Sequence, residues 1–438
     1  MTGTAARLER WLVSDEAEEV LRSLYGPDAL DAERTSWRQA IAGFQETFRQ
    51  ERKAELTLIS APGRTELAGN HTDHNGGIVL AASVHLDTKA VVAPREDSLV
   101  RLHSAGFPTP FEVDLADLEP HEEEEGSPAA LIRGVGHALD VEGYRIGGFD
   151  AFVASSVPVG SGLSSSASFE VLVAEVHNTL WNGGSIAVVP LCRAAQLAEN
   201  RFFGKPCGLM DQIACANGGI VRIDFQNAES PEVRSVSFDF ASRDYVLSVV
   251  NTGSSHADLT SDYASVPEEM KLVARLLGAE RLRDTREEQI IARLPALRAE
   301  AGDRAILRAL HFHRENERVR EISRALEADD MPRYLAGVRA SASSSWRLLQ
   351  NYLPTATTQE QAIALTAALT ERRVPDAVAR VHGGGFAGAV QVYVPEEQFS
   401  RFKSEMEGLF GRGNVVPLRI RNYAAGALDR IYPQSGAG

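Results

Sequence analysis

The stretch PVGSGLSSSAS, from Pro158 to Ser168, has the composition of a turn that binds phosphate. Gly160 and Gly162 allow the backbone to approach phosphate oxygens, and the serine hydroxyls can hydrogen-bond phosphate or ligate Mg²⁺. The apolar segment FEVLVAEV that follows predicts a helix, and a helix N-terminus attracts anions. A serine-rich helix cap has the same composition, so the turn alone leaves both interpretations open.

Two common nucleotide-binding motifs do not describe this turn. No lysine follows its last glycine, so it is not the G-x-x-x-x-G-K-[ST] motif of an ordinary P-loop. Ser165 stands where the dinucleotide-binding motif G-x-G-x-x-G requires its third glycine. The sequence therefore excludes both motifs at this position.

Two other polar, glycine-rich segments lie far from this turn in the sequence. GRTELAGNHTDHNGG runs from Gly63 to Gly77, and HGGGFAG begins at His382. In the first segment, two histidines and an aspartate could ligate a metal ion. Adjacent side chains of an extended stretch often point apart, so a metal site is disfavoured here.

The elements that must position these segments are both helical and extended. Residues 6–55 predict helices, because apolar side chains such as Trp37, Ile41 and Phe44 recur at a spacing of three to four. Residues 56–115 predict a sheet, since short apolar runs such as GGIVLAASVHL and TKAVVAP alternate with Gly, Pro, Asn and Asp. Residues 265–375 predict a nearly continuous series of amphipathic helices.

The chain has 438 residues, which predicts two large domains. We expect an N-terminal domain, 1–225, that contains the early helices, the first polar segment and the Gly/Ser turn. A C-terminal domain, 226–438, would contain the helical series and the last glycine-rich segment. Both halves mix sheet and helix, so the predicted class is α+β.

Charge and composition argue against several kinds of partner. The formal net charge of -15 disfavours an extended surface for nucleic acid or for anionic membranes, because both require clustered Lys and Arg. The first twenty residues lack an apolar core segment, and no stretch approaches 18 apolar residues, so we expect a cytoplasmic protein. Cys192, Cys207 and Cys215 lack metal-site spacing and are expected to be buried free thiols.

Three segments, in this order, resemble the motifs of the GHMP kinase superfamily: APGRTELAGNHTDHNGG, PVGSGLSSSAS and RVHGGGFAG. The first is similar to the galactokinase signature G-R-x-N-x-x-G-E-H-T-D-Y-N-G-G. KPCGLMDQ, residues 205–212, is similar to the galactokinase segment P-C-G-[IL]-M-D-Q, and AEN, residues 198–200, stands where that family has A-E-H. The likeness extends from about residue 20 to the end of the chain.

This resemblance implies both a fold and a reaction. The fold would be the two-domain α+β fold of GHMP kinases, with the active site in the cleft between the domains. The reaction would be the ATP-dependent phosphorylation of the 1-hydroxyl of α-D-galactose, with Mg²⁺ as the metal cofactor.

Asp211 is, by this resemblance, the carboxylate beside the sugar 1-hydroxyl, and Arg64 is its partner cation. A purely structural arginine–aspartate pair is the alternative. The implied sugar contacts are Arg64, Asn70, His71, Asp73, Gly208, Asp211 and Tyr263. The implied ATP contacts are Gly160, Ser161, Gly162, Leu163, Ser164, Ser165 and Ser166.

Mg²⁺ would be held by Ser165 and Glu199, although Glu199 could instead be a solvated residue of its helix. In the third motif, Gly384, Gly385 and Phe386 would close the site from the second domain, with a structural tight turn as the alternative.

Asp73 would receive two adjacent sugar hydroxyls and so distinguish an axial from an equatorial hydroxyl. Tyr263 matches a position that contacts the sugar in the family. Either residue could instead be a capping or core residue.

The chain departs from the family pattern at several positions. Glu66 replaces an asparagine, Asn70 replaces a glutamate and His74 replaces a tyrosine. PAALIRG stands in place of W-x-x-Y-[VI]-K-G, so adenine must contact other side chains. Because position 70 is no longer acidic, the protein would repel an anionic substituent of the sugar less strongly there.

These departures leave alternatives to galactose phosphorylation. The first is a related kinase that acts on galacturonate, N-acetylgalactosamine or arabinose. The second is a non-catalytic protein that senses galactose and ATP. The complete GLSSSAS segment and the presence of Arg64 and Asp211 argue against the sensor.

Overall fold

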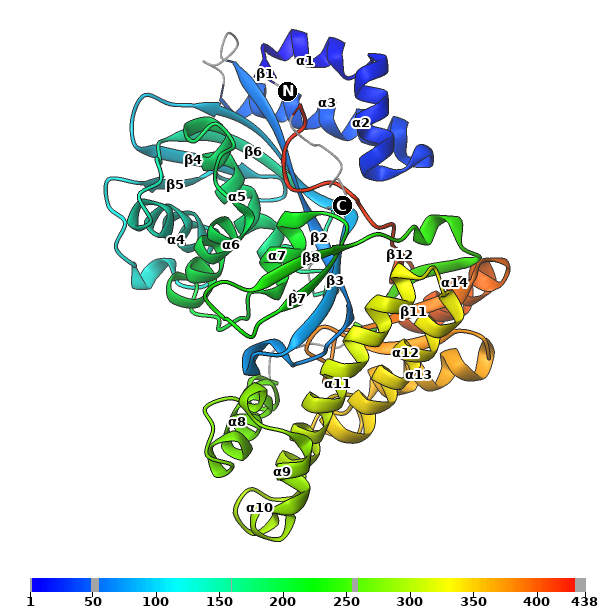
Figure 1. Ribbon diagram of the computed structural model, residues 1–438. Coiled ribbons are helices and arrows are strands. Elements are labelled where there is room, and N and C mark those ends of the chain that lie inside the picture. Colours follow the sequence, from blue (N-terminus) through cyan, green and yellow to red (C-terminus); the bar gives the residue numbers. More distant parts are fainter. Residues whose placement is uncertain (1, 49–54, 159, 254–258, 430–438) are drawn as a thin grey trace.

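The computed structural model describes residues 2–48, 55–158, 160–253 and 259–429. Its strands form a nine-stranded and a four-stranded sheet, and helices cover both (Figure 1). This mixture confirms the predicted α+β class. Among the described residues, no helix is both long and apolar enough to cross a membrane.

Three N-terminal helices pack beside the larger sheet, at the blue end of Figure 1. Trp37, Ile41 and Phe44 are fully buried, together with Leu58 and Val91 of the sheet. The apolar spacing that predicts helices in this region therefore marks their buried face. The helices are α1 (Ala5–Trp11), α2 (Asp15–Tyr25) and α3 (Leu30–Thr47), with a 3₁₀ turn at Pro27–Ala29.

The larger sheet has the strand order β1-β2-β3-β6-β4-β5, and β13 and β7 pair with β2 and β3. The prediction of two separate strands for GGIVLAASVHL and TKAVVAP is wrong, because β3 runs without a break from Ile78 to Pro94. Asp87, in the middle of this strand, is buried and accepts a 2.6 Å hydrogen bond from Tyr25. The other strands are β1 (Thr2–Gly3), β2 (Leu56–Ala68), β4 (Leu99–Ser104), β5 (Phe111–Asp114), β6 (Phe149–Ser155), β7 (Ile220–Asp224), β8 (Glu232–Val236) and β13 (Gly426–Ala427).

Four helices pack around one core with this sheet and carry much of the expected site. They are α4 (Pro128–Val141), α5 (Ser165–Trp181), α6 (Val188–Leu197) and α7 (Met210–Asn217). Helix α6 continues into a π-helical turn, Ala198–Phe202. The thiols of this region are free; Cys192 and Cys215 are buried as expected, whereas the prediction is wrong for Cys207, which is only half-buried.

The smaller sheet is antiparallel, in the order β10-β11-β9-β12. Val390, Val392 and Val394 alternate along β11 and pack with residues of α13 and α14, whereas Tyr393 packs with residues of α11 and α12. The strands are β9 (Tyr245–Asn251), β10 (Val378–His382), β11 (Ala389–Pro395) and β12 (Val415–Pro417).

The helical series predicted for 265–375 is confirmed, and its first members project from one end of the molecule (Figure 1). The helices are α8 (Thr260–Leu276), α9 (Glu287–Ala292), α10 (Leu294–Glu300), α11 (Asp303–Glu327), α12 (Met331–Ser344) and α13 (Ala362–Arg373), followed by α14 (Glu396–Phe410). The domain boundary at 225/226 stays a prediction. Strand pairing assigns β8 and the late strand β13 to the larger sheet.

Gly134 of α4 lies against the π-helical turn, and a Cβ added there would meet Ala198 Cα at 2.7 Å. We expect Gly134→Ala to destabilise the protein by about 1–3 kcal/mol relative to Gly408→Ala, measured by urea unfolding. Gly408 lies in α14 with open space around its added Cβ. Both variants gain the same helix propensity, so the difference isolates the close contact. Equal stabilities would contradict this account of the packing.

Candidate active site

The first motif and the Gly/Ser turn are in direct contact through β2. The Arg64 backbone N–H donates to the Leu163 carbonyl oxygen at 3.1 Å. Gly63 makes this approach possible, because a Cβ there would lie 2.8 Å from the same oxygen. Strand β2 therefore positions the Arg64 side chain beside the turn that was predicted to bind phosphate.

The Gly/Ser turn has a left-handed backbone at three residues. Gly160 and Gly162 have φ of 76° and 73°, and Ser164 has φ of 57°, just before α5 begins at Ser165. A non-glycine residue rarely adopts this conformation, so Ser164 is a strained residue at the helix start. Its hydroxyl donates a hydrogen bond to Asp211, which ties the turn to α7.

Arg64 and Asp211 form a two-pronged ion pair. Arg64 Nε lies 2.8 Å from Asp211 Oδ1, and Nη2 lies 2.7 Å from Oδ2. The third guanidinium nitrogen donates to the Gly162 carbonyl oxygen. The Arg64 side chain is 5% exposed and that of Asp211 is 29% exposed, so the carboxylate is the more accessible partner.

The ion pair fixes the protonation state of both groups. Burial alone would raise the pKa of Asp211, but the charge and hydrogen bonds of Arg64, with the Ser164 hydroxyl, lower it below its ordinary value. Burial lowers the pKa of Arg64, but the neighbouring charge of Asp211 raises it by more, so the pKa of Arg64 is raised overall. Asp211 is therefore an ionised carboxylate at neutral pH, well suited to accept a hydrogen bond.

Glu199 lies in the π-helical turn and faces the start of α5. Its carboxylate accepts from Ser166 Oγ at 3.1 Å, from Lys205 Nζ at 2.9 Å and from Gln212 Nε2 at 3.1 Å. π-helical turns are often found at functional sites, because they change the direction of a side chain. Carboxylate and hydroxyl oxygens are the ligands that Mg²⁺ prefers, so Glu199 and the neighbouring serines fit that ion.

Asp73 lies directly against Gly208, another residue expected to contact the sugar. A Cβ at position 208 would lie 2.0 Å from Asp73 Oδ2, so any larger residue there would displace the Asp73 carboxylate. Burial raises the pKa of Asp73 to about 6, and the nearby charge of Asp211 contributes in the same direction. The two carboxylates therefore occupy one region of the molecule with different affinities for a proton.

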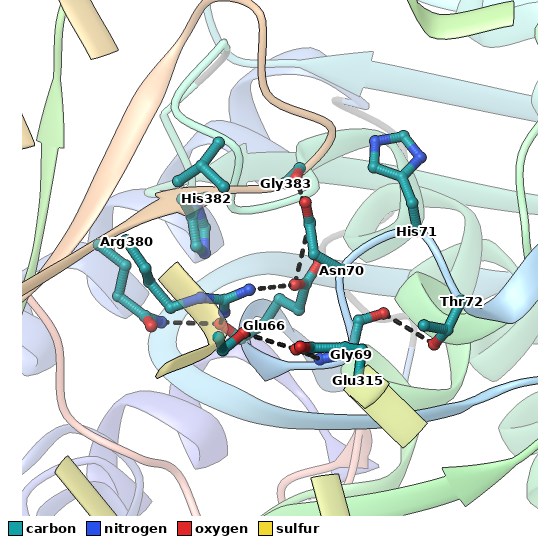
Figure 2. A network of polar contacts seen from close by, with 12 residues as sticks. Glu66, Gly69, Asn70, His71, Thr72, Glu315, Arg380, His382 and Gly383 are labelled. Carbon is teal, nitrogen blue, oxygen red and sulfur yellow. Dashed lines mark hydrogen bonds and ion pairs between the residues drawn. The ribbon is translucent and has the colours of Figure 1, made fainter. Parts of the chain in front are cut away.

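Glu66 and Asn70, two of the departures from the family pattern, contact each other. Asn70 Nδ2 lies 3.1 Å from Glu66 Oε1 and 2.6 Å from the Gly383 carbonyl oxygen, and Asn351 Nδ2 donates to Asn70 Oδ1 at 2.7 Å. Arg380 of β10 pairs with Glu66 at 2.5 Å, and both side chains are buried (Figure 2). Other groups of the protein thus hydrogen-bond to the side-chain amide of Asn70. The expected contact between Asn70 and the sugar stays a prediction.

The third motif is held by hydrogen bonds from three other segments. His71 Nε2 lies 2.8 Å from the Gly384 carbonyl oxygen, and Tyr263 Oη donates to the Gly385 carbonyl oxygen at 2.7 Å. Phe386, with φ of 60°, donates its backbone N–H to the Asn351 carbonyl oxygen at 2.6 Å. Tyr263 therefore contacts the third motif.

The histidines of the first motif do not form a metal site. His74 Nδ1 contacts Asn75 Nδ2 at 2.9 Å, and its ring meets that of His71 edge-on at 5.8 Å. Across the described part of the chain, no three His, Cys, Asp or Glu side chains are grouped so that they could hold a metal ion. Mg²⁺ held by one carboxylate, hydroxyls and phosphate is a different arrangement.

Three residues of this region were missed by the sequence analysis. His382 contacts Thr65 Oγ1 at 2.9 Å and also approaches Gly162, where an added Cβ would lie 2.6 Å from its Nδ1. Burial and the charges of Arg64 and Arg380 keep the pKa of His382 well below its ordinary value, so the ring is neutral. Lys205 and Asn351 are the other two, and only proximity to a motif could have indicated Lys205.

The raised pKa of Asp73 predicts a pH-dependent stability effect. Between about pH 4 and pH 6 the folded protein holds a proton that the unfolded chain has released, so the native state loses stability as pH rises through this range. We expect Asp73→Asn to raise Tm at pH 7.5 and to have a smaller effect at pH 4.5. Asp303→Asn is the control, because Asp303 is exposed and its pKa is lowered by Arg298. An equal gain from Asp73→Asn at both pH values would contradict the assignment.

Comparisons with known proteins agree with this arrangement. Residues 42–94 match the galactokinase galactose-binding signature, and residues 130–219 match the GHMP kinases N terminal domain. The galactokinase of Streptomyces coelicolor is 32% identical over 391 residues, which cover 87% of this chain and 96% of that protein. The galactokinase of Actinobacillus pleuropneumoniae serotype 5b is 30% identical over 339 residues, with 77% and 85% coverage.

Solved structures show the same relationship. The structure of Lactococcus lactis galactokinase complexed with galactose superposes with a TM-score of 0.74 and 26% identity, covering 88% of this chain and 97% of that one. The Methanococcus jannaschii mevalonate kinase shares the fold, with a TM-score of 0.59 and 14% identity over 83% of this chain and 98% of that one. The chain therefore belongs to the galactokinase family of the GHMP kinases and is a sugar kinase.

Proposed function

We propose that this kinase transfers the γ-phosphoryl group of ATP to the 1-hydroxyl of α-D-galactose. The observation that carries the proposal is the ion pair of Arg64 and Asp211 beside the Gly/Ser turn at the start of α5. Phosphoryl transfer requires a phosphate cradle, a cation and a carboxylate that orients the attacking hydroxyl, and these three parts adjoin here. The similar L. lactis enzyme, solved with galactose, supports the choice of sugar.

ATP would bind with its phosphates along residues 160–166, where the α5 N-terminus offers unpaired N–H groups. Ser165 and Glu199 would hold Mg²⁺, which would neutralise charge on the phosphates. We place this ATP-dependent reaction in the cytoplasm.

Asp211 would orient the sugar through one of its two oxygens. Oδ2 already accepts from Arg64 and from Ser164, whereas Oδ1 accepts, among the described residues, from Arg64 Nε alone. A carboxylate oxygen has two lone pairs, so Oδ1 has room for the sugar 1-hydroxyl. The lowered pKa of Asp211 suits a carboxylate that orients the hydroxyl and takes its proton late, as the phosphoryl group arrives.

Asp73, set against Gly208, would receive two adjacent hydroxyls of the same sugar. Asn70, His71 and Tyr263 would border the far end of the sugar and hold the third motif over it. Position 70 carries no charge, and Arg380 already neutralises the carboxylate of Glu66. These two facts keep galacturonate as a second candidate substrate.

The function is tested by measuring ATP consumption with Mg²⁺ for galactose, glucose, N-acetylgalactosamine, galacturonate and arabinose. Phosphorus NMR would identify the product. We expect galactose to be turned over fastest, to an anomeric phosphate. Faster turnover of another sugar would replace galactose as the substrate, and binding of galactose and ATP without turnover would favour the sensor.

Asp211→Asn keeps the shape of the side chain and removes its charge. We expect kcat to fall by about 10²-fold or more, because the amide neither accepts the proton nor balances Arg64. The Kd for ATP, measured by calorimetry, should stay within about threefold, since Asp211 faces the sugar. Asp303→Asn, an exposed aspartate in an ion pair with Arg298, is the control and should leave kcat unchanged. Retained turnover in Asp211→Asn would remove Asp211 from the mechanism.

A further inference from the structure

The Gly/Ser turn lacks the lysine that follows the last glycine of an ordinary P-loop. The structure brings a lysine to the same place from another part of the chain. Lys205 Nζ lies 2.9 Å from Glu199 Oε1, and Ser166 Oγ lies 3.1 Å from that same oxygen. Its ammonium group therefore neighbours the first turn of α5, where the phosphates of ATP are proposed to bind.

The backbone that carries Lys205 is fixed at several points. The Lys205 N–H donates to the Glu199 carbonyl oxygen at 3.0 Å, and the Cys207 N–H donates to Asn200 Oδ1 at 2.6 Å. Gly204, with φ of 83°, lies against Glu125, because a Cβ there would be 2.4 Å from Oε1. The loop from α6 to α7 is thus anchored on both sides of the lysine.

The side chain of Lys205 is much freer than its backbone. It is 61% exposed, whereas the Glu199 side chain that it contacts is 3% exposed. A long, exposed stem allows the ammonium group to move by a few ångströms without disturbing the core. The ion pair therefore holds the ammonium group at the edge of the site and leaves it accessible to an incoming anion.

Lys205 differs from Arg64 in that its charge is not bound to the carboxylate proposed to contact the sugar. Arg64 is engaged by both oxygens of Asp211. Gln212 Nε2 joins Glu199 and Glu170 at 3.1 Å each, so Glu199 keeps partners when the lysine moves. A triphosphate carries more negative charge than one carboxylate, and lysine binds phosphate as a mobile point charge.

We propose that Lys205 is a phosphate-binding residue of the nucleotide site, which pairs with Glu199 until ATP is bound and then contacts its terminal phosphate. It has the role that lysine has in a P-loop, but it lies in the loop between α6 and α7 and not in the Gly/Ser turn itself. The inference rests on the proposed function, because it requires that ATP binds at the Gly/Ser turn.

The test compares the affinities of ATP, ADP and AMP for the full-length protein by calorimetry, with and without Mg²⁺. We expect Lys205→Met to raise the Kd for ATP by about tenfold or more and the Kd for ADP by about threefold or less, with AMP and galactose unchanged. Lys205→Arg should retain most of the affinity for ATP. Lys403→Met, in an exposed ion pair with Glu407 on α14, is the matched control and should change none of these values.

Lys205→Gln is the second variant, because it keeps a hydrogen-bond donor for Glu199 and removes the charge. Its Tm should match that of the native protein, so that a weaker affinity for ATP reflects the lost charge and not unfolding. Equal losses of affinity for all three nucleotides, or no loss of affinity for ATP, would overturn the proposed role of Lys205 but not the proposed function. If the native protein itself binds galactose but no nucleotide, both the proposed function and this inference are wrong.

Discussion

The ion pair between Arg64 and Asp211 is the interaction on which the site depends. Arg64 extends from β2, Asp211 lies in the first turn of α7, and the Gly/Ser turn supplies a carbonyl oxygen and the Ser164 hydroxyl to the same pair. Removing one member of such a buried pair leaves the other charge without compensation, which costs far more than a surface ion pair. The requirement for charge balance therefore fixes three segments, far apart in the sequence, at one point.

A second buried pair joins the two sheets. Glu66 of β2 contacts Arg380 of β10, and Asn70 and Asn351 extend this network to the third motif. The two carboxylates differ in exposure, since the Glu66 side chain is buried among protein contacts and that of Asp211 is 29% exposed. One carboxylate thus stabilises the junction between the sheets, while the other is available to a substrate.

Much of this arrangement could be predicted from the sequence, because it follows from local patterns. Apolar spacing indicates the helices of residues 265–375 and those of the range 6–55, of which residues 49–54 lie outside the described part, and the motifs indicate the family. The continuity of β3 could not be predicted, since the buried Asp87 within it is paired with residues distant in the sequence, among them Tyr25 and Arg421. Lys205 was missed for a similar reason, because its nearness to Ser166 arises only when α6 and α7 pack beside α5.

The exchange of Glu66 and Asn70 shows the same limit of local reasoning. Read separately, each residue is a departure from the family signature. In the structure they touch, so the pair keeps one acid and one amide with their positions exchanged. The physical constraint concerns the pair and its contact with Arg380, and a motif read position by position does not express it.

The π-helical turn at Ala198–Phe202 has a consequence for how this gene can change. The Phe203 N–H donates to the Ala198 carbonyl oxygen, five residues earlier, so the turn contains one residue more than a regular α-helix would. Deleting one residue before Glu199 would restore regular geometry but rotate Glu199 by about 100° relative to α6. Insertions and deletions, usually tolerated in loops, are therefore strongly constrained within this helix, where a single lost codon would separate Glu199 from Ser166.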